Sequence, residues 1–165
     1  MKINVRPLLK GETRQLEFSH KLDLADIRLW GEYPFHQPAE ITGCVREDIQ
    51  GITLEYELNA VLEARCGRCL APVSVPVRYH FSHPVFHEPR EDALFCDSSG
   101  MLDTQELFES DLLPELPSNV LCREDCPGLC PTCGANLTEG ACGCSTSRPD
   151  PRFDVLRKLI ENDSI

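Results

Sequence analysis

The sequence predicts an α+β protein: an antiparallel β-sheet with a long hairpin, short helices and a C-terminal cysteine-rich module. Two stretches of strict two-residue alternation, at 52–58 and 73–81, predict the paired strands of the hairpin. Six of the ten cysteines fall between positions 122 and 144, which predicts a small module with chemistry of its own. We therefore divide the chain into an α+β sheet domain, 1–120, and a cysteine-rich segment with a C-terminal helix, 121–165.

Length and charge limit the possible functions. A chain of 165 residues forms one domain, or one domain with a small appended module. The formal net charge of −11 repels nucleic acid at long range, so contact with RNA needs a local basic patch or a protein intermediary. A merely solvated acidic surface is the simpler interpretation of that charge.

The sequence contains neither an apolar run typical of a signal peptide nor a segment able to span a membrane. We therefore expect a cytoplasmic protein with no membrane partner. In that reducing compartment cysteines are more often metal ligands or free thiols than disulfides.

Three regions of the sheet domain alternate with period two. The first is 16–22, and the second, looser one is 41–47, where Cys44 is expected as a small core residue. The third, 51–82, reads as the long hairpin with a Cys-Gly-Arg-Cys tip. Pro76 falls on its outward set, which favours an edge strand or a bulge.

Two helices are expected. Asp103 and Glu106 have the spacing of a capping box, and Pro114 and Pro117 are expected to end the helix that follows. An Asp-Pro start predicts a short C-terminal helix over 150–160.

The cysteine-rich run has the ligand spacing of a zinc site. Zinc prefers four thiolate or imidazole ligands in a tetrahedron, and a Cys-x-x-Cys turn ended by Gly134 brings two sulfurs to one side of it. Within the run five thiols compete for four positions: Cys126, Cys130, Cys133, Cys142 and Cys144.

Cys66 and Cys69 form a second pair, between two strands rather than at the helix N-terminus that activates redox-active pairs. The tip pair could share one metal with the C-terminal run. Alternatively, with Cys122 counted, eight cysteines suffice for two tetrahedral sites. Structural zinc, as one or two ions, is the expected cofactor, and a zinc-thiolate redox switch is the competing interpretation.

Other chemistry has little support. The sequence has neither a glycine-rich phosphate loop nor a nucleophile elbow, and an all-cysteine shell leaves zinc no open position, so we expect no enzymatic activity. Arg65, Arg68 and Arg78 lie near one end of the hairpin, where they could meet phosphate or simply solubilise a polar face.

Three motifs in this order resemble the YceD family, the large ribosomal RNA subunit accumulation proteins of bacteria and plastids. They are Cys66-Gly-Arg-Cys-Leu70, the run from Cys126 to Leu137, and Cys142-x-Cys144 followed by Asp150-Pro-Arg. The resemblance implies a non-enzymatic role in ribosome biogenesis, through contact with large-subunit ribosomal RNA or a large-subunit ribosomal protein.

On this interpretation Arg68 is the candidate partner contact at a rigid hairpin tip. The candidate metal ligands are Cys66, Cys69, Cys126, Cys130, Cys133, Cys142 and Cys144. An interaction protein unrelated to the ribosome is the alternative to this function.

Overall fold

The computed structural model describes residues 2–49, 51–86, 94–97, 99–144 and 153. Within them the order of elements is β1 (Lys2–Asn4), α1 (Arg6–Leu9), β2 (Gln15–Leu22), β3 (Ala39–Asp48), β4 (Gly51–Arg65), β5 (Pro72–Val85), β6 (Met101–Asp103) and α2 (Gln105–Glu115). The predicted antiparallel sheet with short helices is confirmed. The helix expected over 150–160 lies, apart from residue 153, outside the described residues. In the described part of the chain, no helix is both long and apolar enough to cross a membrane.

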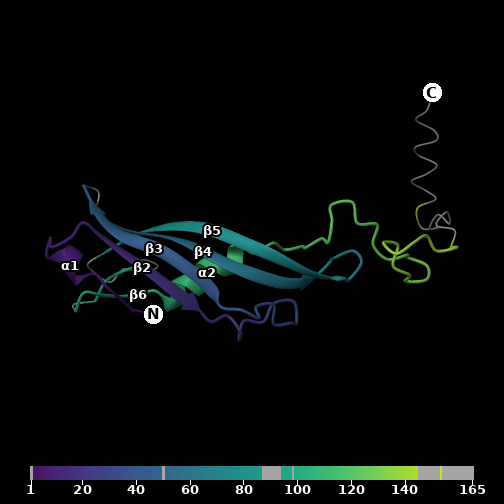
Figure 1. Cartoon of the computed structure of the whole chain (residues 1–165), viewed down its shortest axis with the longest axis horizontal. Helices are drawn as coiled ribbons and strands as arrows, with labels where there is room; N and C mark the ends of the chain where they lie inside the picture. The colour runs from purple at the N-terminus through teal and green to yellow at the C-terminus, as the bar shows by residue number, and fades with distance from the viewer. Residues whose placement is uncertain (1, 50, 87–93, 98, 145–152, 154–165) are drawn as a thin grey trace, which may run out of the picture.

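The main sheet has four antiparallel strands in the order β2-β3-β4-β5, and β1 and β6 form a separate antiparallel pair (Figure 1). β4 and β5 pair from Ile52 opposite Val85 to Arg65 opposite Pro72, and the loop 66–71 joins them. Of the two alternatives for Pro76, the edge strand is correct, because β5 lies at the edge of the sheet and its register with β4 is unbroken.

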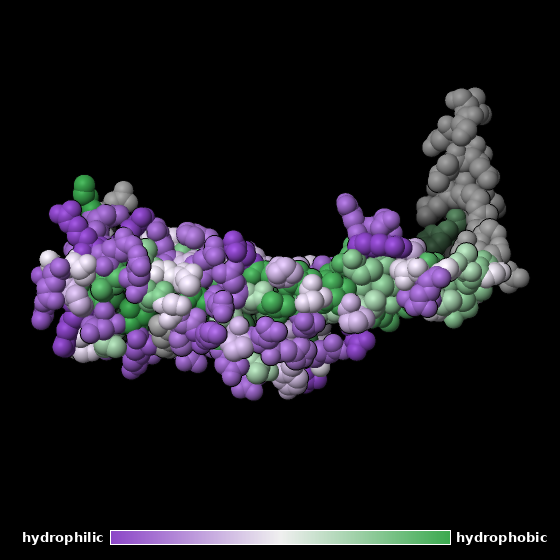
Figure 2. All heavy atoms as spheres, viewed as in Figure 1, coloured by the Kyte–Doolittle hydropathy of each residue, from purple (hydrophilic) through white to green (hydrophobic). Residues whose placement is uncertain are grey.

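The two faces of the sheet differ because successive side chains point to opposite sides. Along β4 every second residue from Ile52 to Leu62 is buried, and α2 packs on that side with Phe108 and Leu112 buried (Figure 1). The intervening residues of β4 are mostly polar. Hydrophilic residues cover much of the visible sheet domain, while hydrophobic ones gather toward the cysteine-rich segment (Figure 2).

Tyr56 joins the sheet to α2 at the centre of the core. It is 1% exposed, and its ring meets Phe108 edge-on at a centroid distance of 4.7 Å. Across the sheet the neighbour is Gly43, where an added Cβ would lie 2.6 Å from the Tyr56 Cβ. The Tyr56 hydroxyl donates to Asp111 Oδ2, and His83 Nε2 lies 2.6 Å from the same oxygen. Burial, followed by the hydrogen bond to Asp111, raises the pKa of Tyr56 and keeps it a donor.

The start of α2 differs from the prediction. The N-cap is Thr104 rather than Asp103, because Asp103 is held in β6 by pairing with β1. The predicted N-cap was therefore wrong by one residue, although Asp103 Oδ1 still accepts from the N–H of Gln105 at 3.4 Å. Pro114 lies inside the helix rather than ending it. The helix ends at Glu115, because Leu116 precedes Pro117 and takes the extended conformation that this position favours.

Cys44 is not the core residue that alternation predicted. It lies half-buried on the polar face, opposite Glu17 on β2 and Glu55 on β4, while its neighbour Val45 faces the core. The alternating set that includes Ile41 and Val45 points inward, so Cys44, which falls between them, lies on the other face. Cys96, by contrast, is buried in the main hydrophobic core.

We predict that Tyr56→Phe lowers the free energy of unfolding by about 1–3 kcal/mol, because it removes a buried donor from the Asp111 carboxylate. Urea denaturation measures this. The matched control is Tyr79→Phe, which removes a hydroxyl that donates to the Glu115 carbonyl at 2.7 Å in an exposed position. Since water can replace that bond, its cost should be smaller; equal costs would contradict the role given to Tyr56.

Candidate metal centres

Eight cysteines gather into two groups of four. The first, here the tip site, consists of Cys66, Cys69, Cys122 and Cys126; the second, the tail site, consists of Cys130, Cys133, Cys142 and Cys144. Within each group all four sulfur atoms lie within 4.8 Å of one another. Each group could therefore hold one metal ion with four ligands.

The sulfur spacing fits a metal rather than a disulfide. In the tip site the Sγ atoms of Cys66 and Cys126 are 3.8 Å apart, and those of Cys69 and Cys122 are 3.6 Å apart. A tetrahedron with zinc–sulfur bonds of about 2.3 Å has edges of about 3.8 Å. A disulfide bond is only about 2.05 Å long, and none of the ten cysteines is disulfide-bonded.

Both sites begin with the same turn. The N–H of Leu70 donates to the Cys66 carbonyl at 2.9 Å, and the N–H of Gly134 donates to the Cys130 carbonyl at 2.8 Å. Leu70 and Gly134 both have positive φ, +61° and +73°. Glycine adopts this conformation readily, but leucine does so at a cost in free energy. The turn thus forces Leu70 into the backbone conformation that Gly134 takes without strain.

Main-chain N–H groups favour thiolate at the first cysteine of each turn. The pKa of Cys66 falls to about 6 because the N–H groups of Cys69 and Cys122 point at its sulfur. The pKa of Cys130 falls to about 6 in the same way, chiefly through the N–H of Cys133. Thiolate is the form that binds metal, so the backbone prepares one ligand in each site.

One thiol in each site resists loss of its proton. The side-chain hydrogen bond to Cys126, followed by burial, raises the pKa of Cys122 to about 12. The side-chain hydrogen bond to Cys133, followed by burial, raises the pKa of Cys144 to about 12. Four crowded sulfurs cannot all carry negative charge without a cation, whereas a divalent metal ion would allow all four to ionise.

The two sites differ in burial. Cys66, Cys69 and Cys126 form a small apolar cluster against Ala71, Val73, Leu121 and Leu129. In the tail site Cys130 alone is buried, and its three partners are half-buried or exposed. The tip site is therefore part of the packed protein, whereas the tail site is a compact loop closed by residues close in sequence.

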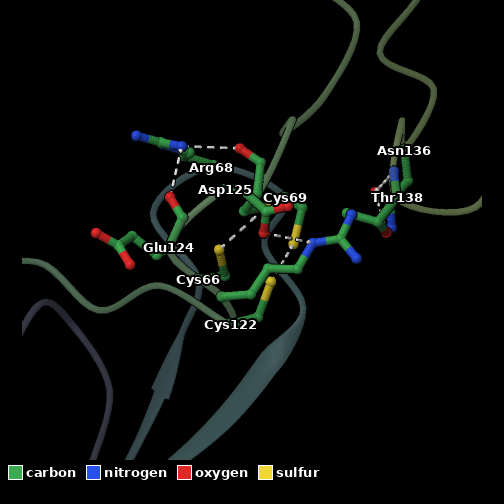
Figure 3. Close-up of polar contacts among 10 residues, drawn as sticks. Cys66, Arg68, Cys69, Cys122, Glu124, Asp125, Asn136 and Thr138 are labelled. Carbon is green, nitrogen blue, oxygen red and sulfur yellow. Dashed lines mark hydrogen bonds and ion pairs between the residues drawn. The ribbon is translucent and has the colours of Figure 1, made fainter.

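Arg68 connects the hairpin tip to the cysteine-rich segment (Figure 3). Its Nη1 donates to the carbonyl oxygens of Cys126 at 2.9 Å and Glu124 at 3.3 Å, and its own carbonyl accepts from the N–H of Leu129 at 3.1 Å. Gly128, at φ +76°, leaves room for this approach, because a Cβ there would lie 3.0 Å from the Arg68 carbonyl. The sequence-based role of Arg68 as a partner contact stays a prediction; these contacts make it a clamp on the tip site.

The grouping of the thiols was hidden in the sequence. Cys126 lies next to the Cys130 turn along the chain, but its sulfur joins Cys66 and Cys69 instead. Cys122, absent from the predicted ligand set, fills the fourth position of the tip site. The sequence did contain a signal for Cys122, because counting it gives eight clustered cysteines. Cys122 and Cys126 complete one set of four, and the four cysteines that follow form the second set.

The fold and the site together define a class: an α+β protein that carries two groups of four cysteines. The family model of the large ribosomal RNA subunit accumulation protein YceD matches residues 54–160, a range that spans both cysteine groups. The chain belongs to this family, as the motifs predicted. The family is named for an accumulation factor rather than for an enzyme.

The relatives carry no assigned function. Uncharacterized proteins of Mycobacterium tuberculosis and Mycobacterium bovis are 29% identical over 122 residues, covering 70% of this chain and 58% of theirs. One of Mycobacterium leprae is 31% identical over 113 residues, covering 64% of this chain and 52% of its own. The match thus spans about half the length of these relatives. No solved structure matches the chain.

We predict that the purified protein holds two metal ions and that Cys69→Ser and Cys133→Ser each remove one, because each takes a ligand from a different group. Elemental analysis gives the stoichiometry. The control, Cys44→Ser, lies outside both groups and should retain two ions. Loss of both ions from either single variant would contradict two separate sites.

We further predict that Arg68→Ala weakens metal binding at the tip site by about tenfold, since outer residues that orient ligands have effects of this size. Chelator competition in a Cys133→Ser background reads the tip site alone. Arg78→Ala is the control, because Arg78 donates to Asn59 on the sheet at 2.9 Å and contacts neither site. If Arg68→Ala and Arg78→Ala bound metal at the tip site with equal affinity, Arg68 would not support that site.

Proposed function

We propose that this protein is a non-enzymatic factor that promotes accumulation of large-subunit ribosomal RNA by assisting assembly of the large ribosomal subunit. The observation that carries the proposal is the family match over 54–160, which includes the hairpin tip and both cysteine groups. The family's name supplies the link to ribosomal RNA.

We propose zinc as the metal of both sites, in a structural role. Four thiolates per site match the closed tetrahedral shells of structural zinc, which leave no position for water or substrate. The spacing of 3.6–3.8 Å between sulfurs of the tip site supports the same assignment. When bound, zinc would supply folding free energy to a turn-rich segment that otherwise buries little apolar surface. A reducing cytoplasmic setting, also proposed, would keep the thiols available.

The direct partner is either large-subunit ribosomal RNA or a large-subunit ribosomal protein. A charge of −11 opposes contact with RNA over most of the surface, so a basic protein satisfies electrostatics more easily. The exposed Arg68 at the hairpin tip is the candidate local contact to either partner. Its clamp role and a partner role are compatible, because only Nη1 is used in the contacts to Cys126 and Glu124.

We predict that depleting the protein in its own cell lowers the ratio of large-subunit to small-subunit ribosomal RNA, with large-subunit precursors accumulating. Quantifying both RNAs, together with gradient profiles of the subunits, measures this. Re-expressed wild type should restore the ratio, whereas Cys69→Ser should fail, because losing the tip site releases the segment that it holds. An unchanged ratio after clean depletion would contradict the proposed function.

A further inference from the structure

A tight turn next to the hairpin tip holds an exposed tryptophan in an unfavourable conformation. Leu29 and Glu32 exchange two main-chain hydrogen bonds of 2.9 Å, which leaves Trp30 and Gly31 as a two-residue loop. Both have positive φ, +52° and +87°. Two positive φ values are the requirement of a type I′ turn, which Asn-Gly satisfies best.

Fold stability does not account for tryptophan at this position. A bulky side chain at positive φ is an outlier, and Trp30 recovers little by burial because it is 58% exposed. Tyr33, two residues beyond the turn, is 56% exposed. Strained residues are concentrated at functional sites, and exposed Trp and Tyr are the side chains most enriched at binding hot spots.

The turn is fixed against the sheet and forms one wall of a groove of about 220 Å³. The Glu32 carboxylate holds Arg65 at 3.0 Å, and the Pro34 carbonyl accepts from the N–H of Glu63 at 2.8 Å. The lining of the groove combines apolar Trp30, Pro34 and Val120 with charged Glu32, Glu63 and Arg65. A rigid aromatic wall beside two carboxylates is therefore present.

The chemistry of this groove favours a cationic side chain. An arginine or lysine is attracted to the face of an indole, and a carboxylate nearby adds a charge-assisted hydrogen bond. Glu63 supplies this carboxylate, since the only described contact of its carboxylate oxygens is the neutral Ser74 hydroxyl at 3.0 Å, whereas the Glu32 carboxylate is already paired with Arg65. The volume is comparable to that of one long side chain.

We propose that this groove binds an arginine side chain from a basic segment of a partner protein. The net charge of −11 attracts such a segment and repels RNA, and the groove itself adds two carboxylates against one arginine. The inference rests on the proposed function and deepens it, because it specifies a basic protein rather than ribosomal RNA as the partner at this surface.

The test measures fluorescence anisotropy of a labelled nine-residue peptide of alternating arginine and alanine on the full chain. Trp30→Asn should weaken binding at least tenfold, while its thermal midpoint stays equal or rises, because Asn-Gly relieves the turn. Glu63→Gln should weaken binding about threefold. The control Ile49→Ala removes a fully exposed apolar side chain beside the other end of β4 and should bind like wild type.

Trp30 is the only tryptophan of the chain, so saturable quenching of intrinsic fluorescence by the same peptide should give the same affinity. Unchanged affinity of Trp30→Asn for the peptide would overturn the inference. Tighter, Trp30-dependent binding of a ten-nucleotide oligouridylate would also overturn it and make RNA the partner. These outcomes are independent of the ribosomal RNA ratio after depletion, which tests the proposed function alone.

Discussion

The rest of the cysteine-rich segment depends on one long-range contact, the meeting of the hairpin tip with Cys122 and Cys126. The tip thiols lie 60 and 53 residues away in sequence from their partners, so closing this loop carries a large entropic cost. Metal coordination would offset this cost, because four metal–thiolate bonds would contribute far more than the small apolar cluster does. The tail site needs no such closure, since its four ligands fall within one short segment.

The same closure builds the groove beside Trp30. The N–H of Gly67 donates to the Val120 carbonyl at 2.8 Å, so the chain leading into Cys122 passes directly over the tip turn. A Cβ at Gly67 would lie 2.2 Å from Asn119 Oδ1, so a larger residue there would have to displace the Asn119 side chain. Asn119 and Val120 in turn line the groove. Metal binding and partner binding would thus be coupled through shared residues, without any need for the partner to touch a sulfur.

The sheet supplies the rigid base for both features. Tyr56, with Gly43 on one side and Phe108 on the other, fixes α2 over the buried face, and the strand that carries Tyr56 continues to the hairpin tip. Because the small Gly43 lies opposite the large Tyr56, β3 and β4 pack closely, and this close packing opposes any shift of one strand along the other. The position of Cys66 at the end of β4 is therefore set by core packing, so the sheet determines where the tip site can hold a metal ion.

The sequence by itself determined the strands and both Cys-x-x-Cys turns, because each follows from a pattern of period two or from spacing within a few residues. Only the tertiary structure decided which thiols gather into the same group of four. Cys126 is four residues from Cys130 along the chain but groups with Cys66, because the clamp of Arg68 and the packing over the tip outweigh proximity in sequence. Likewise, the start of α2 is displaced because Asp103 pairs with β1, and the turn at Trp30 lines a groove because residues 118–120 pass beside the end of β4. Patterns in sequence report local geometry, whereas these contacts depend on chain closure over more than fifty residues.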